Sequence, residues 1–196
     1  PYTFLALGDR GARKGWVEAW QAFYKAFGTP QDTPDVRLII KSRPKVNELL
    51  DMISQAANPD PRVIVWQEDV ADMRQVYSAA DCFVCPSRSE GWGLPHREGA
   101  MMGLPVITQC YSGMDDGHTD AWAIVVEGGT LEPIPSSFEH IAGVWMKADV
   151  DALAAMMRWC YDNSDVVAEE GLNAAAWLRE HQTFDHTAHR LLNMIR

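Results

Sequence analysis

The chain has 196 residues, of which 47% are hydrophobic and 22% charged, a composition typical of one folded domain rather than a disordered segment. Its formal net charge of -10 argues against nucleic acid as a partner, because nonspecific binding to phosphates requires a basic face. No apolar run approaches the ~20 residues of a membrane-spanning helix. We therefore expect a cytoplasmic protein, or one peripheral to a membrane in its full-length form.

Apolar runs alternate with longer amphipathic stretches along the first two thirds of the chain. The runs are continuously apolar, as in strands that are buried on both faces. Strands that alternate with helices of this length predict right-handed crossovers and an α/β fold, a Rossmann-like parallel sheet of about six strands with helices on both faces. The predicted strands are 3–8, 36–40, 62–66, 82–85, 106–109 and 123–126, and the predicted helices are 14–27, 45–57, 69–80 and 95–102.

The last third of the chain lacks this alternation. Residues 128–148 are rich in glycine and proline, which predicts a loop, and a helical tail is expected from about residue 149. The chain opens at Pro1 directly before a strand-like segment, so we expect a single domain, residues 1–196, cut near a boundary of a longer protein.

Cys82 and Cys85 have the C-x-x-C spacing of metal and redox motifs, but they fall within a predicted buried strand. Positions three apart on a strand face opposite sides, so the two thiols cannot bind one ion. We interpret them as packing residues, and buried free cysteines suit a reducing cytoplasm.

The loop after the first predicted strand, residues 8–15, reads GDRGARKG. Its glycines allow close backbone approach, and Arg10, Arg13 and Lys14 supply positive charge beside the start of a helix. In a parallel sheet, ligands bind beyond the carboxyl ends of the strands. The loop therefore predicts a pyrophosphate site or, as the alternative, a solvated basic loop. It matches neither a dinucleotide nor a Walker A motif.

A second loop follows the fourth predicted strand and contains the segment EGWGLPHRE, residues 90–98. Gly91 and Gly93 free backbone amides for a ligand, and Pro95 marks the first turn of a helix. Carboxylates such as Glu90 and Glu98 accept paired hydrogen bonds from vicinal hydroxyls. The pair thus suits a ligand that carries a sugar at each end of a diphosphate.

The Glu90-x7-Glu98 segment resembles the EGFGLPxxE signature of retaining glycosyltransferase family 4, which has the GT-B fold. The AMMGLPV continuation, the GDRGARKG loop and the segment VYSAADCFVCPSRSEG resemble the same family. The resemblance covers roughly residues 3–126. It implies that the chain is the C-terminal, nucleotide-sugar-binding half of such an enzyme.

The resemblance implies a role for each matching residue. Lys14 and Arg10 would hold the donor diphosphate, although the arginine-to-lysine spacing is one residue shorter than usual and leaves Arg13 as the alternative to Arg10. Glu90 would contact the transferred sugar and Glu98 the ribose. The catalytic set would then be Glu90, Arg10 and Lys14, and the remaining donor contacts would come from Glu98, Gly91, Trp92, Gly93, Leu94, Arg13 and Gly113.

The resemblance also implies an enzyme that transfers a hexose-type sugar with retention, without a cofactor or a metal. Its partners would be a nucleotide-sugar donor, the missing N-terminal acceptor-binding half, and a glycan, lipid or protein acceptor, and the isolated domain would be inactive. Where the family usually has Gly-Gly and a glutamate, Asp115 and Asp116 stand without an assigned role. We expect Trp122 and Trp145 to pack rather than to stack on sugars. One alternative is a non-catalytic nucleotide-sugar-binding module. Another is an epimerase or a phosphorylase of similar two-domain shape, and for a phosphorylase Lys147 is a poor cofactor lysine.

Overall fold

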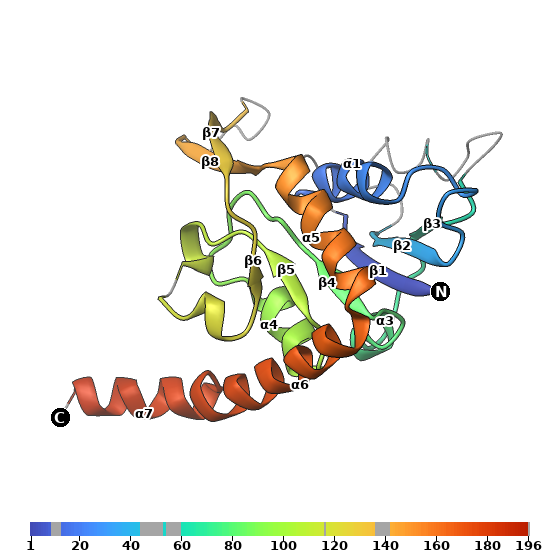
Figure 1. Cartoon of the computed structure of the whole chain (residues 1–196). Helices are drawn as coiled ribbons and strands as arrows, with labels where there is room; N and C mark the ends of the chain where they lie inside the picture. Colours follow the sequence, from blue (N-terminus) through green and yellow to red (C-terminus); the bar gives the residue numbers. More distant parts are fainter. Residues whose placement is uncertain (9–12, 44–52, 54–59, 116, 136–141, 196) are drawn as a thin grey trace.

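The computed structural model describes residues 1–8, 13–43, 53, 60–115, 117–135 and 142–195. Six strands form one parallel sheet in the order β3-β2-β1-β4-β5-β6 (Figure 1). The strands are β1 (Tyr2–Leu7), β2 (Val36–Lys41), β3 (Val63–Trp66), β4 (Cys82–Val84), β5 (Val106–Thr108) and β6 (Ile124–Val125). The Rossmann-like α/β fold predicted from the sequence is therefore confirmed.

Helices cover both faces of the sheet, and each face has its own apolar core. On one face, α1 (Trp16–Phe27) and α5 (Val150–Asp162) pack against side chains such as Phe4 and Leu38. On the other face, α3 (Arg74–Tyr77), α4 (Leu94–Met101) and α6 (Ser164–His181) enclose a second cluster around Leu5 and Phe83. Alternate residues of β1 point to opposite faces, as the period of a strand requires.

The C-terminal third continues as helices, as predicted. After α5 and α6, α7 (Phe184–Met194) extends away from the sheet (Figure 1) and none of its residues is buried. No helix in the described part of the chain is long and apolar enough to cross a membrane.

The prediction of a loop over residues 128–148 was wrong. The segment contains β7 (Gly129–Pro133) and β8 (Val144–Ala148), which pair as an antiparallel hairpin separate from the main sheet. Gly128 and Gly143 contributed to the prediction of a loop. In the structure they have positive φ angles of 77° and 140° and directly precede β7 and β8. The buried Trp145 fixes the hairpin to the domain, which composition alone does not reveal.

Helix 69–80 was predicted too long, because only Arg74–Tyr77 is helical. The Asp72 carboxylate accepts a hydrogen bond from the backbone N–H of Arg74 at 2.9 Å, a local turn that sets where the helix begins. The predicted helix 45–57 lies outside the described residues apart from Ile53, which packs against the first core. Cys82 and Cys85 are buried in the two different cores, as their spacing predicted.

Candidate functional site

The strand order reverses between β1 and β4, because β2 and β3 lie on one side of β1 whereas β4, β5 and β6 lie on the other. The loops that follow β1 and β4 meet at this point. Gly15 has a φ of 67°, and a Cβ at this position would lie 2.1 Å from the backbone oxygen of Pro86. The Arg88 backbone N–H donates to the Arg13 carbonyl at 2.8 Å. A glycine is thus required where the first loop touches the fourth strand's end, and this switch point is the usual ligand position in such sheets.

Lys14 and Glu90 form an ion pair across this junction. Lys14 Nζ donates to Glu90 Oε1 at 2.6 Å, and Arg13 lies 3.3 Å from Oε2 of the same carboxylate. The side chains of Lys14 and Glu90 are only 11% and 8% exposed. Burial by itself raises the pKa of the Glu90 carboxyl, but hydrogen bonds from Lys14 and Ser87 and the charges of Lys14 and Arg13 outweigh burial and lower this pKa. Glu90 is therefore held ionised.

The backbone of Glu90 is fixed by a second contact. Gly113 N–H and Ser112 Oγ each donate to the Glu90 carbonyl at 2.9 Å. A Cβ on Gly113 would lie 2.1 Å from the Gly91 carbonyl oxygen, so this approach also needs a glycine. The structure thus places Gly113 against the Glu90 loop. Gly91, by contrast, has no other atom within 4 Å of a built Cβ and opens to solvent.

The turn between Glu90 and α4 presents two exposed apolar side chains. Gly93 precedes α4 with a φ of 71°, and Trp92 and Leu94 beside it are 46% and 53% exposed. The Arg97 guanidinium lies 3.9 Å from the centroid of the Trp92 ring and 4.8 Å from that of Trp122. Arg97 therefore fixes Trp92 at the rim of the turn.

Glu98 lies on α4 and is exposed. The hydroxyl of Tyr77 donates to Glu98 Oε2 at 2.9 Å, and Tyr77 is itself 2% exposed. Burial first, and then the negative charge of Glu98, raise the pKa of Tyr77, which therefore stays a neutral donor. Sequence reasoning missed Tyr77, although it stands in the segment VYSAAD that carried part of the family resemblance.

Arg88, which sequence reasoning also missed, connects the loop that carries Glu90 to α1 and to the β7–β8 hairpin. Its guanidinium is hydrogen-bonded to the buried Glu18 of α1, and it donates to Glu132 of β7 at 3.0 Å. It also lies 5.1 Å from the ring centroid of Trp145 in β8. The hairpin is thereby coupled to the loop that carries Glu90. The only sequence signal was a charged residue inside a buried segment.

The other residues singled out in the sequence differ in their exposure. Arg10 and Asp116 lie outside the described residues, and Asp115 is exposed. Trp122 and Trp145 are each 2% exposed, in agreement with the packing role predicted for them. Lys147 is 42% exposed on the hairpin, with its Nζ 3.8 Å from Glu132 Oε1.

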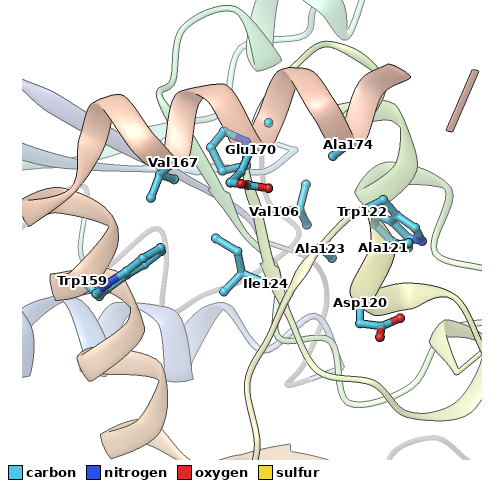
Figure 2. Close-up of a pocket in the computed structure, with 12 residues that line it drawn as sticks. Val106, Asp120, Ala121, Trp122, Ala123, Ile124, Trp159, Val167, Glu170 and Ala174 are labelled. Carbon is cyan, nitrogen blue, oxygen red and sulfur yellow. The ribbon is translucent and has the colours of Figure 1, made fainter. Parts of the chain in front are cut away.

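The pocket in Figure 2 lies at the other end of the sheet. It has a volume of about 220 Å³ and is bounded by Val106 and Ile124, which begin β5 and β6, and by residues of α5 and α6 such as Trp159 and Val167. The pocket therefore lies at the amino ends of these strands, whereas Lys14 and Glu90 follow the carboxyl ends of β1 and β4. This apolar pocket is therefore separate from the candidate site.

Residues 2–163 match the family model described as glycosyl transferases group 1, and the chain belongs to this family. Membership of the family supports a glycosyltransferase activity. No curated protein is significantly similar to the chain in sequence.

Solved structures with similar folds include the C-terminal domain of a glycosyl transferase group 1 family protein (LpcC) from Francisella tularensis. That match has 21% identity and a TM-score of 0.65, and it covers 93% of this chain and 87% of that one. Sucrose-phosphate synthase from Thermosynechococcus elongatus matches at 20% identity and a TM-score of 0.71 over 100% of this chain and 45% of that one. Anabaena HepE in complex with UDP-glucose matches at 18% identity and a TM-score of 0.64 over 91% and 44%. The chain therefore has the fold of a GT-B domain and spans less than half the length of the latter two proteins.

Proposed function

We propose that the chain is the donor-binding half of a retaining glycosyltransferase of family 4, which moves a hexose-type sugar from a nucleoside diphosphate to an acceptor. The observation that carries the proposal is the buried ion pair between Lys14 and Glu90 across the β1–β4 switch point. Exposed Glu98 follows Glu90 by eight residues and lies within α4. This arrangement joins a cation, a shielded carboxylate and a solvent-facing carboxylate at the edge of the sheet where ligands bind.

Lys14, with Arg13 or Arg10, would stabilise the negative charge that develops on the leaving nucleoside diphosphate. Lys14 is held in place before the ligand arrives, and such preorganised charge lowers the barrier without reorganisation during the reaction. Because Lys14 already pairs with Glu90, an incoming diphosphate would share its ammonium with this carboxylate. The ammonium can donate to both the diphosphate and the Glu90 carboxylate, because it has three N–H donors.

The two carboxylates would hold different hydroxyl groups of the donor. Glu98 is exposed and uses one oxygen to accept from Tyr77, so its other oxygen is available to the ribose. Glu90 would contact the transferred sugar, with the backbone of Gly91, Trp92, Gly93 and Leu94 alongside. We assign Glu90 no nucleophilic role, so the two-carboxylate logic of glycosidases does not apply here.

Transfer would need an acceptor-binding half in addition to this chain, and the isolated domain would bind donor without turning it over. Sucrose-phosphate synthase and HepE, of which the match covers 45% and 44%, are long enough to contain a further domain. HepE was solved with UDP-glucose, which is consistent with a nucleotide-sugar as the donor here. The acceptor would be a glycan, a lipid or a protein. A non-catalytic nucleotide-sugar-binding module would share the binding but show no transfer in the full-length protein.

The proposal is tested by isothermal titration calorimetry of the chain with UDP, GDP and ADP in the presence of EDTA. We expect at least one of them to bind, without a metal, because cations of the chain serve the phosphates. Absence of heat with all three at millimolar ligand would contradict the proposal, and binding that needs Mg²⁺ or Mn²⁺ would contradict its metal-free form. Retention is tested in the full-length protein by the anomeric configuration of the product.

A further inference from the structure

Lys41 is a buried cation at the carboxyl end of β2. It is 7% exposed, and the strand register aligns it with Leu7 of β1 on one side and Trp66 of β3 on the other. Register partners in a parallel sheet point to the same face. The three residues therefore form a row along the ligand-binding edge of the sheet, with an ammonium between an aliphatic and an aromatic side chain.

The ammonium of Lys41 uses only part of its hydrogen-bonding capacity. Its Nζ donates to the Ser42 carbonyl at 2.8 Å and lies 5.9 Å from the ring centroid of Trp66. No further acceptor contacts Nζ within the described parts of the chain, although an ammonium carries three N–H donors. Burial lowers the pKa of Lys41, and the charges of Asp69 and Glu68 oppose that shift. Burial of an ammonium whose donors are only partly paired costs free energy, and a bound ligand with a hydrogen-bond acceptor at this position would offset that cost.

The row adjoins the ribose side of the proposed donor site. Leu7 and Trp66 pack in the same apolar cluster as Tyr77, whose hydroxyl holds Glu98. A nucleobase is bonded directly to its ribose, and neighbouring strands lie about 4.8 Å apart. A ribose on Glu98 with its diphosphate at Lys14 leaves the base to extend along the edge toward β2 and β3. The indole of Trp66 offers a surface on which a base can stack.

We propose that Lys41 determines which base the donor carries, by donating a hydrogen bond to a base carbonyl oxygen. The inference rests on the proposed function. Uracil and guanine present carbonyl oxygens, whereas adenine presents an amino group in the place of the guanine oxygen. A lysine ammonium is a donor only and cannot pair with an amino group. A site built to hydrogen-bond one partner rejects a ligand that lacks it, so the site takes uracil or guanine nucleotides in preference to adenine nucleotides.

The test is calorimetry of the full chain and its Lys41→Met variant with UDP, GDP and ADP. We expect the parent to bind UDP or GDP about tenfold more tightly than ADP, a difference typical of one hydrogen bond to a charged group. Lys41→Met should lose that preference and leave ADP affinity unchanged. Arg37→Met is the matched control, because Arg37 is an exposed cation of the same strand and should alter neither.

The outcomes separate this inference from the proposed function. If the parent binds none of the three nucleotides, the proposed function fails. If the parent binds ADP as tightly as UDP and GDP, the inference alone is overturned, whether or not Lys41→Met folds. If Lys41→Met stays folded and weakens all three equally, Lys41 serves the phosphates or the ribose, and base selection by this residue is again overturned.

Discussion

The two glutamates of the motif are held in opposite ways. Glu90 has a side chain that is 8% exposed, two cations within 3.3 Å and a backbone carbonyl bonded to Gly113 and Ser112. Glu98 is exposed and has one hydrogen bond, from Tyr77. From this difference we expect Glu90 to stabilise the fold as well as to serve the proposed site, whereas substitution of Glu98 should affect the fold little. Substitutions at the two positions must therefore be compared by different measurements.

The largest expected effect is on stability, in Glu90→Ala. Removal of one partner of a buried ion pair leaves the other charge uncompensated and costs about 3–5 kcal/mol. We expect a loss of this size in the free energy of unfolding, measured by urea denaturation. The double variant Lys14→Met/Glu90→Leu should recover much of this loss of stability but should not bind the donor, because it lacks the Lys14 ammonium proposed to hold the diphosphate. A loss below about 1 kcal/mol, as for a surface ion pair, would show that Glu90 contributes little to the stability of the fold.

Gly91→Ala tests the ligand side of the same loop. Its Cβ meets no atom within 4 Å and its φ is not positive, so the variant should fold normally. The added methyl group would stand where the donor is proposed to lie. We therefore expect binding of the nucleotide-sugar to weaken by about tenfold, or ~1.4 kcal/mol, with an unchanged melting temperature. If calorimetry shows undiminished affinity, the donor does not lie against Gly91.

Tyr77→Phe tests how Glu98 is positioned. The variant removes only the hydroxyl that donates to Glu98 Oε2. We expect nucleoside diphosphate affinity to fall by about 0.5–1.5 kcal/mol, the net worth of one hydrogen bond. Tyr111→Phe, which removes a hydroxyl bonded to the Val144 carbonyl at 3.3 Å on the hairpin, is the control and should bind normally. Equal losses in both variants would indicate a general loss of stability.

The smallest effect expected is on the pH dependence of stability. The pKa of Glu90 is lower in the folded chain than its ordinary value of 4.5. Its ionised form therefore stabilises the fold above about pH 4.5, and this contribution is lost as the pH falls through the lowered pKa. The difference in unfolding free energy between the parent and Glu90→Gln should shrink as the pH falls from 7 to 3. A difference independent of pH would contradict the lowered pKa.

The sequence predicted those features that depend on neighbouring residues. The strands of the main sheet and the Glu90–Glu98 motif are local patterns, and the position of Lys14 after the first strand followed from the topology of a parallel sheet. Contacts between distant residues were missed, because no local pattern marks them. Arg88 is 70 residues from Glu18 and 44 from Glu132. Tyr77 and Glu98 are separated by 21 residues, and only the fold brings them together.

The prediction that the first-loop cations serve a phosphate overlooked their partner. Arg13 and Lys14 both contact Glu90, so the charges assigned to different parts of the donor meet one another in the folded chain. The spacing along the sequence could not reveal this, since 76 residues separate Lys14 from Glu90. The same contact explains why a buried carboxylate can stay ionised at this position.

The central claim is that Glu98 binds the ribose and Glu90 the transferred sugar. It is tested most directly by calorimetry of Glu98→Ala and Glu90→Gln with the nucleoside diphosphate that the parent binds and with its sugar conjugate. Glu98→Ala should weaken both ligands by about 1–3 kcal/mol, because both contain the ribose. Glu90→Gln should weaken the sugar conjugate and leave the nucleoside diphosphate nearly unchanged. If Glu98→Ala binds both ligands as tightly as the parent, or Glu90→Gln keeps full affinity for the sugar conjugate, the corresponding assignment is wrong.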